Sequence, residues 1–231
     1  MTTKEQSLDA LIFDFDGVVV DSEPVHFAAF GQVLRERGLD LAREDYYSRY
    51  LGFDDHDCFR AVGADRGRPF GEDQIARMIA EKTRLVQQAF ARSIQPLSGA
   101  VELIRSAAGT RLPVGVCSGA LREEIVLASR TVGVLDCFAA IVSAQEAPAG
   151  KPDPSGYRLT LQLLSQKAGR VLLPARTVVV EDAPAGIAAA RAAGMKVLAV
   201  TNSYPPAELV RADRVVSSLA QVTLADLRKL L

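Results

Sequence analysis

The stretch ALIFDFDG at residues 10–17 joins four apolar residues to two carboxylates and a glycine. A continuous apolar run of this length is typical of a strand that is buried on both faces of a parallel sheet. Asp14 and Asp16 follow where this strand ends, and Gly17 permits a sharp turn. Since ligands bind beyond the carboxyl ends of the strands in an open parallel sheet, the stretch predicts a polar site as well as a strand.

Short apolar runs of the same kind recur, and most of them precede a segment with helical periodicity. They lie at residues 114–117, 139–142, 177–180 and 196–200, with a shorter one around Val215. Strands that alternate with helices in this way indicate an α/β fold with a parallel sheet.

The connection between the first two strands is too long for an ordinary loop. It shows helical periodicity at residues 24–37 and 72–91 and contains no convincing strand. We therefore expect a helical domain, residues 17–92, inserted into a core domain made of residues 1–16 and 93–231.

The composition is that of an ordinary globular protein, with 48% hydrophobic and 24% charged residues among 231. A formal net charge of -1 provides no cationic surface for nucleic acid or an anionic membrane, so we expect neither as a partner. Cys58, Cys117 and Cys137 are odd in number and widely spaced, which indicates thiols in a reducing compartment. With no leader pattern and no long apolar stretch, we expect a cytoplasmic protein.

A second pair of acids, Glu181 and Asp182, also ends a buried apolar run. Carboxylates that converge at one sheet edge repel each other unless a cation joins them, and Mg²⁺ is the natural candidate for an oxygen-rich site. Two purely structural readings compete with this one. Asp14 and Asp16 could belong to a solvated turn, and Asp182 could cap a helix that begins near Pro184.

An anion site is predicted from Ser118, Gly119 and Lys151. Ser118 and Gly119 end one strand and precede a helix, where a hydroxyl and free backbone N–H groups suit a phosphate, although Ser118 could also be a plain helix cap. Lys151 is followed by Pro152 and Pro154, and this stiffness favours a positioned charge over a solvated one.

These segments, taken in order, resemble the four motifs of the haloacid dehalogenase superfamily. The resemblance covers essentially the whole chain and is strongest to members similar to β-phosphoglucomutase and phosphoglycolate phosphatase. It rests on DFDGV at 14–18, Ser118, KPDP at 151–154 and EDAPAGI at 181–187. The resemblance implies a Rossmann-like parallel sheet core with an inserted helical cap.

The resemblance also implies a role for each motif residue. Asp14 would be the nucleophile that forms an aspartyl-phosphate, and Asp16 would be the general acid and base. Ser118 and Lys151 would hold the phosphoryl oxygens. The metal ligands would be Asp14, the backbone carbonyl of Asp16, and Asp182, with Glu181 ligating through water or lying behind them.

Two chemistries of related enzymes are disfavoured. The dehalogenase branch resembles this chain in fold but lacks the second acid, which is present here as Asp16. Phosphonatase relatives use a cap lysine as a Schiff base, and the only lysine of comparable placement, Lys82, is expected to be a solvated charge in mid-helix.

The choice between phosphatase and mutase depends on the cap. Where mutase-like proteins carry cations for a second phosphate, this chain keeps Gly52 but has acids at Asp54 and Asp55, which favours water as the acceptor. His26 lies where the mutase also has a histidine, so the mutase stays open, although a helix-face histidine explains it equally well. We expect six cap residues to face the substrate: His26, Arg49, Gly52, Asp54, Asp55 and His56.

The sequence therefore predicts a Mg²⁺-dependent phosphatase of a small phosphomonoester, such as a sugar phosphate or a phosphoglycolate-like compound. We expect a monomer or a weak homodimer. The fold could also have been retained as a binding module without turnover, but the presence of all the motif residues argues against this reading.

Overall fold

The computed structural model describes residues 7–231, and within them the chain divides into two compact units. The sheet unit contains residues 7–21 and 94–231, and the helical unit contains Ser22–Ser93. No helix among the described residues is long and apolar enough to cross a membrane. All three cysteines are free thiols.

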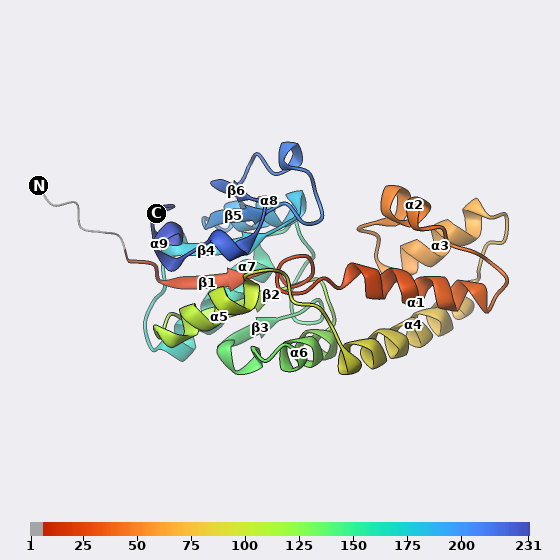
Figure 1. The fold of residues 1–231 in the computed structure, drawn as a ribbon, viewed down its shortest axis with the longest axis horizontal. Coiled ribbons are helices and arrows are strands. Elements are labelled where there is room, and N and C mark those ends of the chain that lie inside the picture. The colour runs from red at the N-terminus through yellow and green to blue at the C-terminus, as the bar shows by residue number, and fades with distance from the viewer. Residues whose placement is uncertain (1–6) are drawn as a thin grey trace, which may run out of the picture. The chain divides into compact units, whose positions relative to one another are not determined.

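The sheet unit is built on six parallel strands, in the order β3-β2-β1-β4-β5-β6 (Figure 1). The strands are β1 (Ala10–Phe13), β2 (Val114–Cys117), β3 (Ala140–Val142), β4 (Thr177–Glu181), β5 (Lys196–Val200) and β6 (Arg214–Val216). The helices are α5 (Ala100–Gly109), α6 (Arg122–Thr131), α7 (Ser155–Ala168), α8 (Pro184–Ala192) and α9 (Leu224–Arg228), with short 3-10 turns at Leu135–Cys137, Pro174–Arg176, Pro206–Glu208 and Leu219–Gln221. The predicted α/β fold with a parallel sheet is confirmed.

The core of this unit forms because β1 is apolar at every position and therefore buried on both faces. Ile12 packs with Tyr157 of α7, Val179 of β4 and Ile187 of α8 on one side of the sheet. The side chain of Leu11 points to the opposite face, since side chains alternate along a strand, and it is also fully buried.

The strand register determines where the functional residues emerge. Phe13 of β1 lies level with Val116 of β2 and with Val180 of β4. Since all three strands are parallel, their carboxyl ends lie side by side at one edge of the sheet, with β1 in the middle. The residues that follow these three ends are therefore neighbours in space.

The helical unit consists of α1 (Glu23–Arg35), α2 (Arg43–Asp45), a π-helical turn (Tyr46–Tyr50), α3 (Asp55–Asp65) and α4 (Glu72–Arg92). Phe30 of α1, Phe59 of α3 and Met78 of α4 belong to its own apolar core. The helical periodicity predicted α1 and α4 to within two residues at each end.

The first boundary between the units lies five residues later than the sequence suggested, at Asp21 rather than Asp16. Residues 17–21 stay with the sheet because backbone hydrogen bonds hold them there. Leu97 N–H donates to Val19 O at 3.0 Å, and Asp21 N–H donates to Gln95 O at 2.9 Å. At the return, Ser93 belongs to the helical unit and Ile94 to the sheet unit.

Candidate active site

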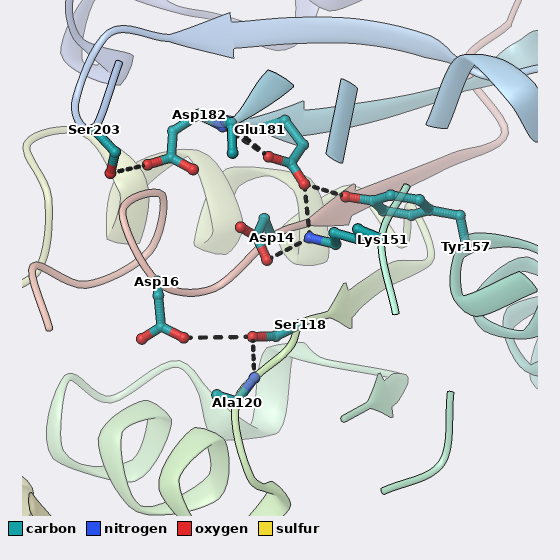
Figure 2. Close-up of polar contacts among 10 residues, drawn as sticks. Asp14, Asp16, Ser118, Ala120, Lys151, Tyr157, Glu181, Asp182 and Ser203 are labelled. Carbon is teal, nitrogen blue, oxygen red and sulfur yellow. Dashed lines mark hydrogen bonds and ion pairs between the residues drawn. The ribbon is translucent and has the colours of Figure 1, made fainter. Parts of the chain in front are cut away.

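Three charged side chains meet at the carboxyl edge of the sheet (Figure 2). Lys151 Nζ lies 2.7 Å from Asp14 Oδ1 and 2.6 Å from Glu181 Oε1, so one ammonium joins the ends of β1 and β4. Burial by itself lowers the pKa of Lys151, but the carboxylates of Asp14 and Glu181 raise it by more, and the net pKa lies above its ordinary value. Lys151 is therefore a fixed positive charge beside Asp14.

The carboxylate of Glu181 is fully engaged by hydrogen bonds. Its Oε1 accepts from Lys151 Nζ and from Tyr157 Oη, the latter at 2.7 Å, and its Oε2 accepts from the backbone N–H groups of Asp182 and Ala183. The absence of a side chain at Gly186 makes this possible, because a Cβ there would lie 1.6 Å from Oε1. Glu181 is thus held rigidly and holds Lys151 in turn.

Asp182 lies against the turn that follows β1. Its Oδ2 accepts a hydrogen bond from Ser203 Oγ, and a Cβ at Gly17 would lie 2.0 Å from the same oxygen. The helix α8 has Ala183 as its N-cap with no side-chain cap, so Asp182 does not play the capping role that the sequence left open. Gly17 is therefore needed for two reasons, its positive φ of 73° and this close approach.

Asp14, Glu181 and Asp182 form a cluster suited to a hard divalent cation. Each offers one carboxylate oxygen, and these oxygens all lie within 4.8 Å of one another. Burial raises the pKa of Asp14 well above its ordinary value, although Lys151 acts in the opposite direction. Burial and the charge of Glu181 raise the pKa of Asp182 to about 7. Ionising acids so placed is costly, and a bound cation would relieve that cost, so the donor set fits Mg²⁺.

Ser118 and Asp16 face each other beside this cluster, as Figure 2 shows. Ser118 Oγ lies 3.5 Å from Asp16 Oδ2 and accepts a hydrogen bond of 3.0 Å from the backbone N–H of Ala120. Ser118 does not cap α6, whose N-cap is Leu121. Gly119 is exposed, and a Cβ there would meet nothing within 4 Å, so its backbone is accessible.

Two residues of this site, Tyr157 and Ser203, could not be predicted from the sequence motifs. Tyr157 lies on α7, and its position in the sequence does not predict that its hydroxyl contacts Glu181 at the end of β4. Burial and the charge of Glu181 raise the pKa of Tyr157 well above its ordinary value, so it stays a hydrogen-bond donor. Ser203 lies in the turn after β5, and only the neighbouring position of β4 and β5 would have drawn attention to it.

The predicted cap residues all lie in the helical unit. Gly52 adopts a positive φ of 86° in the turn before α3, and Asp54 caps α3 by accepting a 2.8 Å hydrogen bond from Asp57 N–H. His56 Nε2 lies 2.8 Å from Glu72 Oε2, and this hydrogen bond raises the pKa of His56. Arg49 pairs with Asp65.

His26 lies edge-on to Phe90 within the same unit, with ring centroids 6.1 Å apart. Burial, with a smaller contribution from the charge of Lys82, lowers the pKa of His26 to about 3. The imidazole is therefore neutral at neutral pH.

The expectation that Lys82 is a solvated charge is wrong. Lys82 is 4% exposed, its Nζ lies 2.7 Å from Asp55 Oδ1, and it sits 4.8 Å from the centroid of the Phe30 ring. Helical periodicity predicts which face of the helix a lysine lies on, but it does not predict whether an acid from another helix packs against that face.

The chain matches the family model described as haloacid dehalogenase-like hydrolase over residues 11–200. The chain belongs to this family. Hexitol phosphatase A of Escherichia coli (strain K12) is 32% identical over 216 residues, which cover 92% of each chain. β-Phosphoglucomutase of Bacillus subtilis (strain 168) is 27% identical over 223 residues, which cover 94% of this chain and 92% of that protein.

The crystal structure of CbbY from Rhodobacter sphaeroides in complex with phosphate superposes with a TM-score of 0.82 over 95% of this hydrolase and 99% of that chain, at 24% identity. This likeness supports the fold. The relatives' names include both phosphatases and a phosphoglucomutase, so the hydrolase is an enzyme of a family that contains both activities. The resemblance found in the sequence motifs is confirmed.

Proposed function

We propose that this hydrolase is a Mg²⁺-dependent phosphatase that removes the phosphoryl group from a small sugar or polyol phosphate through an aspartyl-phosphate on Asp14. The arrangement that carries this proposal is the Asp14 carboxylate at the end of the central strand, 2.7 Å from Lys151 Nζ and beside the acids at the end of β4. A fixed cation next to a carboxylate at the sheet edge suits attack on a phosphoryl group, whose charge must be neutralised as it transfers.

Mg²⁺ would be held by the carboxylates of Asp14 and Asp182 and by the backbone carbonyl of Asp16. When bound, the ion supplies positive charge to the phosphoryl oxygens and to the acids around it. We assign to Glu181 the role of positioning Lys151, because both of its oxygens are already engaged.

In the first half of the reaction, an Asp14 oxygen attacks phosphorus and the bond from phosphorus to the leaving oxygen breaks. The protonated carboxyl of Asp16 gives its proton to the leaving alkoxide, which departs as an alcohol. Lys151 and the Ser118 hydroxyl hold the non-bridging oxygens during this transfer, and the backbone N–H groups near Gly119 add further donors.

In the second half, the Asp16 carboxylate takes a proton from a water molecule as that water attacks the phosphorus of the aspartyl-phosphate. The bond between phosphorus and the Asp14 oxygen breaks, and inorganic phosphate leaves. Asp14 returns as a carboxylate and Asp16 returns protonated, so the enzyme is regenerated and one water is consumed.

The charges of the helical unit favour a substrate whose remaining part is neutral and carries hydroxyl groups, rather than one that carries a second phosphate. The one deeply buried cation of its described residues, Lys82, is already neutralised by Asp55, and two further acids, Asp54 and Asp57, cluster with His56. The name hexitol phosphatase of the E. coli relative fits this substrate class. We propose that His26, Gly52, Asp55 and His56 contribute to substrate selection.

The test is a panel of hexitol phosphates, ketose and aldose phosphates, and phosphoglycolate, assayed for phosphate release with Mg²⁺ and with a chelator. We expect release from sugar or polyol phosphates that depends on Mg²⁺. Acid quenching during turnover followed by peptide mass spectrometry should find a phosphoryl adduct on Asp14.

The B. subtilis relative makes mutase activity the competing outcome. If β-glucose 1-phosphate yields glucose 6-phosphate faster than inorganic phosphate, the enzyme is a mutase. An adduct on a residue other than Asp14 would overturn the proposed mechanism for either activity.

A further inference from the structure

The edge of the sheet opposite the candidate active site carries a hollow with two lobes, called here the cationic hollow. The smaller lobe, about 200 Å³, is lined by Arg111, Arg170 and Arg228. The larger lobe, about 400 Å³, adds Lys167. Both lobes are lined by four of the same residues, which shows that they adjoin: Arg111, Leu112, Pro113 and Arg170. The lining includes residues at the starts of strands, whereas Asp14 follows the end of β1.

Positive charge in the cationic hollow exceeds negative charge. Within residues 7–231, Arg111, Lys167 and Arg228 have no ion-pair partner. Arg170 Nη1 lies 3.2 Å from Asp9 Oδ1, but Asp9 also pairs with Arg176 at 3.0 Å. This local excess contrasts with a formal net charge of -1 for the whole chain.

Helix ends explain part of this charge but not all of it. The helices α5, α7 and α9 all end at the hollow, and cations near a helix C-terminus are stabilising. Each helix end carries about half an elementary negative charge at most, so three of them offset less than the three unpaired cations supply. Asp136, in the larger lobe, is the one acid that lines the hollow among the described residues, and it does not remove the excess.

The backbone conformation of Arg111 is unfavourable for an arginine, which suggests that its side chain has a function. Arg111 has φ 61°, the only positive φ of a non-glycine residue in the described chain. It follows the C-terminus of α5, where its N–H bonds Ala108 O and the N–H of Leu112 bonds Ala107 O. Glycine is the residue that normally occupies this position, because it adopts the left-handed conformation at lower cost. The helix end alone therefore does not account for an arginine here.

We propose that the cationic hollow binds a polyphosphate group, either free or carried by a nucleotide. One guanidinium group can donate two parallel hydrogen bonds to the oxygens of a phosphate. A chain of phosphates can therefore bind several arginine side chains at once. The lobe volumes are in the range of small-molecule sites. The four residues of β1, roughly 13 Å of extended chain, separate this edge from Asp14, so the ligand would not compete with substrate. This site is independent of the proposed phosphatase activity.

The test is calorimetric titration of the full-length protein with tripolyphosphate, ATP and adenosine, in chelator so that the acidic active site lacks the metal that would attract phosphate. We expect one saturable site for tripolyphosphate and for ATP, weakened by added salt. Arg111→Gly and Arg228→Ala should each weaken binding about tenfold or more, consistent with the loss of a charged contact. Arg77→Ala, which removes an exposed cation from α4 in the other unit, should leave binding unchanged.

Arg111→Gly also separates the proposal from a purely structural role. Its thermal midpoint should be equal to or higher than that of the parent protein, because glycine suits the backbone there. If the midpoint falls while binding is unchanged, or if no probe binds saturably, the proposal is wrong. Equal affinity for ATP and tripolyphosphate would identify the phosphate chain as the whole recognised group, and tighter ATP binding with measurable adenosine binding would identify a nucleotide.

Discussion

Each unit of this protein pairs a lysine with an acid, and the two lysines differ in the number of carboxylates that surround them. Lys151, whose side chain is 20% exposed, faces two acids, Asp14 and Glu181, with Asp182 close by. Lys82, 4% exposed, faces one, Asp55. Around Lys151 the carboxylates outnumber the cations, and in the proposed function a bound metal ion would balance that excess. The pair in the helical unit is balanced, as a structural contact requires.

The largest effect is expected for the nucleophile. Asp14→Asn keeps the shape of the side chain but removes the attacking oxygen's charge, so phosphate release should fall by about 10⁴-fold or more, with an unchanged circular dichroism spectrum. Asp40→Asn, which makes the same change at an exposed site, should be fully active. A variant that retains even about a tenth of the activity would exclude Asp14 as the nucleophile.

The two lysines can be compared directly by Lys151→Met and Lys82→Met. Lys151→Met leaves Glu181, 0% exposed, without its cation, so the free energy of unfolding should fall by about 3–5 kcal/mol and turnover should be lost. Lys82→Met leaves Asp55 partly solvated, so the expected loss is smaller, about 1–3 kcal/mol.

Denaturant unfolding and phosphate release measure both lysine variants. Adding Asp55→Asn to Lys82→Met should recover part of the stability, because the stranded charge is then gone. Equal losses for the two lysines would show that the contrast in their surroundings has no energetic consequence.

Alanine substitutions at two glycines, one in each unit, compare a crowded backbone position beside Glu181 with an open one. Gly186→Ala places a Cβ 1.6 Å from Glu181 Oε1, which must shift and take Lys151 with it, so we expect a loss of about 1–3 kcal/mol and reduced turnover. Gly31→Ala in α1 meets nothing within 4 Å and should stabilise by about 0.5–1 kcal/mol. Both values come from denaturant titration, and a stabilised, fully active Gly186→Ala would contradict the rigid placement of Glu181.

Asp182 in the sheet unit and His26 in the helical unit should contribute to stability with opposite dependence on pH in the absence of metal. The pKa of Asp182 is raised from 3.8 to about 7, so its contribution to stability is full below pH 3.8 and is lost as pH rises through 7. The pKa of His26 is lowered from 6.5 to about 3, so its contribution is full above pH 6.5 and is lost as pH falls toward 3.

Unfolding titrations at several pH values in chelator measure these two slopes. Asp182→Asn should reduce the loss toward neutral pH, to which the raised pKa of Asp14 also contributes, and Mg²⁺ should oppose the same loss in the parent protein. His26→Gln should reduce the loss toward acid pH, to which carboxyl groups with lowered pKa values also contribute. The assignment is refuted for either residue whose variant keeps the parent's pH dependence.

Local pattern was sufficient for the strands and for the acids at their ends. The run before Asp14 is apolar at every position and the run before Glu181 is apolar from Val178 onward, so their burial and their strand conformation could both be predicted. The inserted helices were predicted for the same reason, because α1 and α4 show helical periodicity. The exact domain boundary was not, since the hydrogen bond from Asp21 N–H to Gln95 O joins residues far apart in the chain.

Side-chain contacts between elements that are far apart in the sequence could not be predicted from local sequence patterns. Tyr157, Ser203 and the burial of Lys82 were all missed, because each depends on which helix or strand packs beside another. The identity of the acid that faces a lysine is a property of packing, and no local spacing encodes it.

By itself the sequence determined that a parallel sheet would present Asp14, Asp16, Ser118 and the acid pair at its carboxyl edge, because hydrophobic periodicity dictates which residues are buried and where each strand stops. The tertiary structure alone decided that β1 lies between β2 and β4, that Glu181 positions Lys151, and that Lys82 is neutralised in the other unit. The physical reason is that burial follows from local composition, whereas the pairing of buried charges depends on long-range packing.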